Sequence, residues 1–207
     1  MKIARLFYPV KVLGPGNRVG IWTAGCHRRC KGCANPELWN ADNLPHMNVE
    51  QIISAIKRAG QAGIIDGITI SGGEPLNQED ELKDLLNQIH TELGIEDIIL
   101  FTGYEINNTS DFDWVRESCS LVIDGTYDET RNKGEVLRGS DNQSYVFKND
   151  YWKEFYGEYI RQNNGRNLAQ NFTVSDGVVS VGIHKPDFNN ELNLRLKEHS
   201  IGRIDNE

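Results

Sequence analysis

Residues 19–33 of the chain read VGIWTAGCHRRCKGC, and this stretch joins a short apolar run to a loop that carries three of the four cysteines. Val19 to Ala24 has the continuous apolar character of a buried strand. A disulfide framework spreads its cysteines to tie distant segments together, and a cluster of three cannot pair off internally. The three crowded thiols are therefore expected to bind a metal. The lone Cys119, beside an apolar strand, is expected to be a small core residue.

The spacing of the clustered cysteines narrows the kind of metal group. Cys26, Cys30 and Cys33 stand four and three positions apart. This spacing brings three thiolates onto one side of a tight loop, the geometry that a cuboidal 4Fe-4S cluster requires, and the fourth iron then has no cysteine. A structural zinc site is the alternative, with His27 or a distant residue as the fourth ligand. The loop also carries basic side chains that favour thiolate over thiol: Arg28, Arg29 and Lys31.

Outward from this loop, short apolar runs alternate with amphipathic stretches. This alternation predicts units in which a crossover helix joins two strands. Such units give an α/β fold with a parallel sheet. Asn48 is expected to cap the first helix, and Gly94 is expected to end the second. The predicted elements after the first strand are a helix over 48–62, a strand over 64–71, a helix over 78–93, a strand over 98–102, a helical piece over 112–117 and a strand over 120–124.

A second motif ends the second predicted strand, where residues 68–75 read ITISGGEP. Alone, Gly-Gly-Glu-Pro is usually a strand-to-helix turn. Between Cys33 and Gly72 there is room for one helix and one strand, so a right-handed crossover brings both loops to the carboxyl edge of adjacent parallel strands. Gly72 and Gly73 would expose main-chain polar groups to a close ligand, and Glu74 would offer a carboxylate to an ammonium group.

The charge balance excludes two classes of partner. With 22 Lys plus Arg against 30 Asp plus Glu, the formal net charge is -8. Nucleic acids and anionic lipid surfaces both require a basic footprint, so neither is expected as a partner. The first twelve residues are too short and too interrupted for a secretory signal, and no apolar run approaches the ~18 residues of a membrane span. We therefore expect a soluble, cytoplasmic protein.

Taken together, the Cys-x3-Cys-x2-Cys loop and the later Ser-Gly-Gly-Glu-Pro motif resemble the radical S-adenosylmethionine (SAM) superfamily. Over roughly residues 5–147 the chain is also similar to the activating proteins of anaerobic ribonucleotide reductase. The resemblance implies an incomplete, open (β/α) barrel whose carboxyl edge carries one 4Fe-4S cluster and SAM. The further motifs that carry the resemblance, in the right order and spacing, are Gly14–Arg18, Trp39, Phe101–Tyr104, Leu121–Gly125 and Arg138–Gln143.

The resemblance also assigns site residues, with no catalytic residue beyond the cluster and SAM. Cys26, Cys30 and Cys33 would ligate the cluster, and its open iron would chelate the amino and carboxylate groups of the SAM methionine. Thr102 and Asp124 end the third and fourth predicted strands and so face the same edge. A cap or turn role is the alternative for Asp124. The remaining assignments are the main chain at Gly32 and Ala34 for the adenine, and Gly72, Gly73 and Glu74 for the methionine end.

The implied reaction begins with reduction of the cluster by an external donor such as flavodoxin. Electron transfer into SAM then yields a 5′-deoxyadenosyl radical, which abstracts a Cα hydrogen from a glycine of a partner enzyme. The expected partner is a glycyl-radical enzyme such as anaerobic ribonucleoside-triphosphate reductase. Two rivals remain: a small radical SAM enzyme that modifies a peptide or metabolite, and a zinc-stabilised binding module without catalysis.

The pattern of short apolar runs ends after about residue 147. We therefore expect a radical SAM core over 1–147 and a carboxyl-terminal extension over 148–207 that packs on it. Within the extension, Trp152, Phe155, Tyr156 and Tyr159 recur at helical spacing. Residues 173–183 alternate around Asp176-Gly177, a hairpin signal because type I′ turns need positive φ at both central positions.

Overall fold

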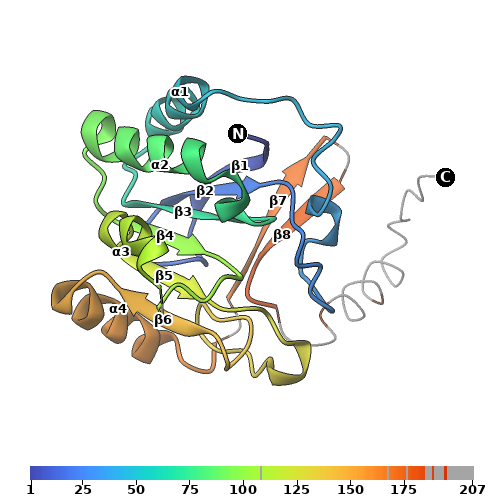
Figure 1. Cartoon of the computed structure of the whole chain (residues 1–207). Helices are drawn as coiled ribbons and strands as arrows, with labels where there is room; N and C mark the ends of the chain where they lie inside the picture. The colour runs from blue at the N-terminus through green and yellow to red at the C-terminus, as the bar shows by residue number, and fades with distance from the viewer. Residues whose placement is uncertain (108, 167, 176, 185–187, 189–193, 195–207) are drawn as a thin grey trace.

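The computed structural model describes residues 1–107, 109–166, 168–175, 177–184, 188 and 194. Its main feature is a six-stranded sheet with the strands in sequence order, β1 to β6 (Figure 1). The central strands are parallel, which confirms the predicted α/β class, and β1 and β6 add antiparallel edges that were not predicted. The strands are β1 (Ile3–Val10), β2 (Arg18–Thr23), β3 (Gly67–Gly72), β4 (Ile98–Phe101), β5 (Leu121–Asp124) and β6 (Ser144–Phe147).

The crossover helices begin and end at the expected signals. Asn48 forms a capping box with Gln51 at the start of α1 (Val49–Gly60). Helix α2 (Glu79–Gln88) continues into a π-helical turn, Ile89–Leu93, and Gly94 ends it with φ +64°. Such a left-handed C-cap is the conformation that glycine adopts without strain. Helix α3 (Asp113–Ser118) is the crossover helix between β4 and β5.

Most predicted boundaries shift by one to three residues, and two of these shifts have a clear physical reason. The second predicted strand begins at Gly67 instead of Ile64, whose side chain is 79% exposed and so contributes nothing to a buried strand. The predicted helix from Gln78 is preceded by a 3-10 turn, Pro75–Gln78, because proline lacks an N–H and suits the first turn of a helix. Neither shift changes which loops reach the carboxyl edge of the sheet.

The two faces of the sheet have different coverings, and the alternation of side chains along each strand decides which residue faces which. On one face, Ile98 and Leu100 join the core beneath α1, α2 and α3. On the other, Ile99 and Ile123 pack with Tyr156 of α4 (Asp150–Asn163). Cys119 is fully buried on the first face, which confirms the core prediction, and burial raises the pKa of its thiol to about 12.

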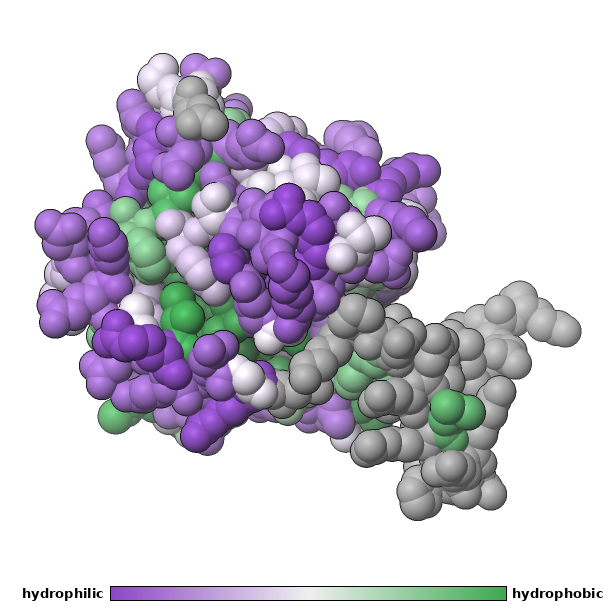
Figure 2. All heavy atoms as spheres, turned by 90° about the horizontal axis from the view of Figure 1, so that it is seen from below, coloured by the Kyte–Doolittle hydropathy of each residue, from purple (hydrophilic) through white to green (hydrophobic). Residues whose placement is uncertain are grey.

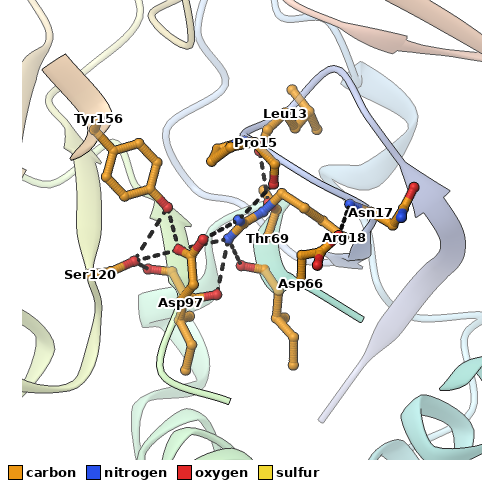
Figure 3. Close-up of polar contacts among 11 residues, drawn as sticks. Leu13, Pro15, Asn17, Arg18, Asp66, Thr69, Asp97, Ser120 and Tyr156 are labelled. Carbon is orange, nitrogen blue, oxygen red and sulfur yellow. Dashed lines mark hydrogen bonds and ion pairs between the residues drawn. The ribbon is translucent and has the colours of Figure 1, made fainter. Parts of the chain in front are cut away.

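A buried polar node lies on the α4 side of the sheet, at the amino ends of the strands (Figure 3). The fully buried Arg18 pairs with Asp97 at 2.7 Å and donates from Nε to Thr69 Oγ1 at 2.7 Å. The Tyr156 hydroxyl donates to the same Asp97 carboxylate. Burial raises the pKa of Tyr156, so this hydroxyl remains a donor. A buried charge needs such partners, and this node therefore connects α4 with β2 and β3.

The carboxyl-terminal hairpin lies across the face that α1 to α3 leave free. Its strands are β7 (Ala169–Val174) and β8 (Gly177–Gly182), which confirms the predicted hairpin. The register pairs Val174 with Gly177, so Gly177 belongs to the strand instead of the turn centre; Asp176 lies outside the described residues. Phe172 stacks on Phe7 of β1 at 4.4 Å between ring centroids.

Seen from below the view of Figure 1, the surface is mostly hydrophilic, with smaller hydrophobic areas between polar side chains (Figure 2). Across the described part of the chain, no helix has both the length and the apolar character needed to cross a lipid bilayer.

Candidate active site

A cavity of about 280 Å³ opens at the carboxyl ends of the parallel strands. Register explains its position, because β2 pairs in parallel with β3 from Arg18–Gly67 to Thr23–Gly72 and the loops after both strands leave the sheet together. Every residue predicted for the site lines this cavity, except Asp124. Those residues are Cys26, Cys30, Gly32, Cys33, Ala34, Gly72, Gly73, Glu74 and Thr102.

The cysteine loop is held by its own main chain and by the turn that follows it. The Cys26 N–H donates to Trp39 O at 3.1 Å, and the Cys33 N–H donates to Cys30 O at 3.2 Å. Gly32 has φ +71°, a left-handed conformation that suits glycine in such a tight loop. The Asn35 N–H points at Cys33 Sγ at 3.4 Å. The loop therefore presents its thiols to one cavity and already directs an amide donor at one sulfur.

Burial is the largest influence on the thiol pKa of two of the three cysteines. It raises the pKa of both Cys30 and Cys33, while Arg28 acts in the opposite direction on Cys30. The expected thiolate-favouring charge is thus present, but burial outweighs it. Metal binding must then displace protons from these sulfurs, since only thiolates are effective ligands.

The three thiols that line the cavity are a suitable donor set for a cuboidal cluster, which holds each thiolate on a separate iron. His27, the proposed fourth zinc ligand, is exposed and is absent from the cavity lining. The buried Arg28 Nε, which has no hydrogen-bond partner among the described residues, also suits an anionic guest.

Gly72 and Gly73 join the second motif to the cysteine loop. A Cβ on Gly72, which has φ +115°, would lie 2.3 Å from Thr23 O, and a Cβ on Gly73 would lie 2.5 Å from Gly25 O. The main-chain N–H groups of Gly73 and Glu74 donate to those same two carbonyls, at 2.8 and 2.9 Å. The Gly73 amide is therefore used inside the protein and is not among the main-chain groups that this turn can offer to a ligand.

Glu74 is the anionic side chain of the cavity, and it is only 2% exposed. Its carboxylate accepts hydrogen bonds from the Leu76 N–H at 3.1 Å, the Thr102 hydroxyl at 2.8 Å and the Gly103 N–H at 2.8 Å. Burial raises the pKa of Glu74, and these donors together with Arg28 oppose that rise. Thr102 thus lines the cavity while its hydroxyl orients Glu74.

Arg28 is a site residue that sequence reasoning treated only as a neighbour of the thiols. Its Nε lies 3.7 Å from Glu74 Oε2, and its Nη1 donates to Thr126 Oγ1 at 2.9 Å. The guanidinium also covers the Tyr104 ring at 4.1 Å from the centroid. These partners are 46 to 98 positions away in the chain, so local spacing contained no signal for them.

Asp124 lies beside the site and is directed elsewhere. It is 3% exposed, it does not line the cavity, and its carboxylate accepts a hydrogen bond from the Ile106 N–H at 3.0 Å. This contact matches the turn role that was the alternative for this residue. The next residue, Gly125, reaches the cavity instead.

The carboxyl-terminal hairpin forms another wall of the cavity, whereas the sequence predicted only that the extension packs on the core. Residues 180–184 line it, and Val181 is packed in a cluster with Leu13, Trp22 and Leu38. The Asn132 side chain donates to His184 O at 2.9 Å, which connects the hairpin to the loop after β5. A segment far from the cysteines thus contributes to the same cavity.

Comparison with known proteins identifies the kind of protein that has this site. The family model for the 4Fe-4S single cluster domain matches residues 12–146. The anaerobic ribonucleoside-triphosphate reductase-activating protein of Enterobacteria phage T4 is 33% identical over 148 residues, 69% of this chain and 92% of the relative. The protein of the same name from Escherichia coli (strain K12) is 29% identical, over 66% of this chain and 93% of the relative.

A second kind of relative has a related name. The pyruvate formate-lyase-activating enzyme of Clostridium pasteurianum is 32% identical over 137 residues, 62% of this chain and 56% of that enzyme. The cluster family sets aside the interpretation as a zinc-binding module. The chain therefore belongs to the 4Fe-4S single cluster domain family, as a radical SAM activating enzyme that uses a 4Fe-4S cluster and SAM.

Proposed function

We propose that this enzyme installs a glycyl radical on an anaerobic ribonucleoside-triphosphate reductase. The observation that carries the proposal is the cavity in which Cys26, Cys30 and Cys33 lie with Glu74 at the carboxyl edge of the sheet. The names of the relatives that match most of their own length support this choice of partner.

Each cysteine of the loop would hold one iron, which leaves the fourth iron open for SAM. Gly72, Gly73 and Glu74 would border the methionine end, and the main chain at Gly32 and Ala34 would border the adenine. When bound, the reduced cluster and SAM supply the adenosyl radical that removes a hydrogen atom from the substrate. The chain itself positions these groups and keeps water away from them. An external one-electron donor such as flavodoxin would reduce the cluster.

We also infer the finer architecture. The parallel strands β2 to β5, open at two antiparallel edges, correspond to an incomplete (β/α) barrel. The core would span 1–147 and the extension would begin at 148. Support for this division comes from the family match, which ends at residue 146, before α4 and the hairpin.

A second candidate function keeps the SAM chemistry and changes the substrate to a peptide or metabolite. The hairpin favours it, because residues 180–184 add a wall to the cavity from a segment that the family match does not cover. The two candidates differ in whether a protein glycine acquires the radical.

The proposal is tested by anaerobic reconstitution with iron and sulfide, followed by incubation with SAM, a reductant and an anaerobic ribonucleotide reductase. We expect about four irons per chain, 5′-deoxyadenosine, and a glycyl radical signal in electron paramagnetic resonance (EPR) spectra of the reductase. Cys30→Ala should lose the cluster and all activity, whereas Cys119→Ala, which alters a thiol in the core, should retain both. Deoxyadenosine without a glycyl radical on the reductase would favour the second candidate.

A further inference from the structure

Arg28 occupies space that the fold keeps open for it. A Cβ on Gly103 would lie 2.4 Å from Arg28 Cδ and 2.8 Å from its Nε, so a larger residue after β4 would displace this side chain. The Tyr104 ring and the Thr126 hydroxyl hold the far end of the guanidinium. The Arg28 side chain therefore extends from the cysteine loop across the carboxyl ends of β3, β4 and β5.

The hydrogen bonding of this cation is incomplete, while that of its anionic neighbour is nearly complete. Glu74 already accepts from Leu76, Thr102 and Gly103. Arg28 Nε is buried without a hydrogen-bond partner in the described structure, and at 3.7 Å from Glu74 Oε2 it makes an ion pair but no hydrogen bond. A buried N–H without an acceptor is costly, so this donor is suited to an anionic ligand atom.

The charges lining the cavity complement one part of SAM. Among the described residues that line the cavity, Arg28 is the only lysine or arginine, and Glu74 is the only aspartate or glutamate. The methionine moiety of SAM carries an ammonium and a carboxylate on the same carbon. A carboxylate and a guanidinium side by side match that pair of charges, and the planar guanidinium can hold a carboxylate with two hydrogen bonds.

We propose that Arg28 binds the carboxylate of the methionine moiety of SAM, beside the amino group that Glu74 takes, in addition to the chelation of both groups by the open iron. The cysteine loop then supplies both the cluster ligands and a SAM-binding cation. This assignment rests on the proposed function, because it requires SAM in the cavity. It differs from a role on the cluster alone, in which Arg28 would only offset the charge of the iron and sulfide.

The test compares SAM with decarboxylated SAM, which keeps the amine and sulfonium and lacks the carboxylate. The full chain is loaded with an oxidised cluster, so that no turnover occurs, and the affinity for both compounds is measured by isothermal titration calorimetry. Arg28→Gln should weaken SAM binding by about 10- to 100-fold, the range for a charged hydrogen-bond partner. Its affinity for decarboxylated SAM should change far less. Arg28→Lys should restore part of the preference for SAM.

Arg29→Gln is the matched control, since it removes the same charge from an exposed position on the same loop. Iron content and visible spectra confirm equal cluster loading in every variant. An equal loss of affinity for both compounds in Arg28→Gln, or no loss for either, overturns the proposal. A cluster-loaded wild-type chain that fails to bind SAM would instead contradict the proposed function, so the two failures are distinguishable.

Discussion

At the scale of single residues, Glu74 combines a buried charge with a nearly filled set of hydrogen bonds. Three donors from two segments converge on one carboxylate: Leu76 of its own turn, and Thr102 and Gly103 after β4. A group that accepts so many bonds organises the loops around it as well as facing the cavity. A substitution here should therefore affect both ligand binding and the stability of the fold.

We predict that Glu74→Gln weakens SAM binding while the cluster spectrum stays unchanged. Glutamine also replaces one carboxylate oxygen with an NH2 group, which faces a donor instead of accepting from it, and this should lower the free energy of unfolding by about 1–3 kcal/mol. Calorimetry of the cluster-loaded protein and urea unfolding measure the two effects. Glu79→Gln, which alters a half-exposed carboxylate that pairs with Lys83, is the control. Equal SAM affinity in wild type and Glu74→Gln would contradict the ammonium-binding role.

At the scale of elements, α4 is attached to the sheet by both apolar and polar contacts. Tyr156 packs with Ile99, Leu121 and Ile123, and its hydroxyl reaches Asp97. Asp97 in turn holds the buried Arg18 at the amino end of β2 (Figure 3). This node lies at the opposite ends of the strands from the cysteine loop, so its effect should be on stability and not on ligand contacts.

Tyr156→Phe tests the polar part of this attachment, because it keeps the ring and removes the donor. Loss of a hydrogen bond to a buried carboxylate should lower the free energy of unfolding by about 1.5–3 kcal/mol. Tyr151→Phe is the control on the same helix, where the side chain is 66% exposed, and it should change stability by less than about 0.5 kcal/mol. Urea denaturation measures both. Similar values for the two variants would show that the hydroxyl contributes nothing to α4 docking.

At the scale of the whole molecule, the hairpin lines one side of a cavity whose cysteines lie near the other end of the chain. Val181 is 4% exposed and packs with Val10, Leu13 and Trp22. The polar contacts of Gln170 with Pro9 O and with the Lys11 N–H, at 2.7 and 2.9 Å, attach the other strand to β1. Undocking of the hairpin should therefore open the cavity to solvent.

Val181→Asp should produce this opening, because an unpaired carboxylate cannot remain in that apolar contact without a large cost. We expect the reconstituted cluster to bleach several-fold faster in air than in wild type, measured by its visible absorbance. Val178→Asp introduces the same charge on the same strand at a position that is 66% exposed, and it should bleach at the wild-type rate. Equal rates in the two variants would mean that the hairpin does not protect the cluster.

The sequence by itself determined the features that depend on nearby residues. The capping box at Asn48, the left-handed end at Gly94 and the buried strand before Cys26 are all set within a few positions, by periodicity and by the chemistry of single side chains. The parallel order of β2 and β3 follows from one crossover, and it predicted that the cysteine loop and the Gly-Gly-Glu turn share an edge.

Only the tertiary structure decided what those features touch. The partners of Arg28 at Glu74, Tyr104 and Thr126, the connection of Arg18 with Tyr156, and the hairpin wall all join residues far apart in the chain. The edge strands β1 and β6 also belong here, since they pair antiparallel with neighbours and lack the pattern of a strand buried on both faces. Local patterns carry periodicity and turn chemistry, whereas these contacts depend on which surfaces the packed sheet brings within a few ångströms of each other.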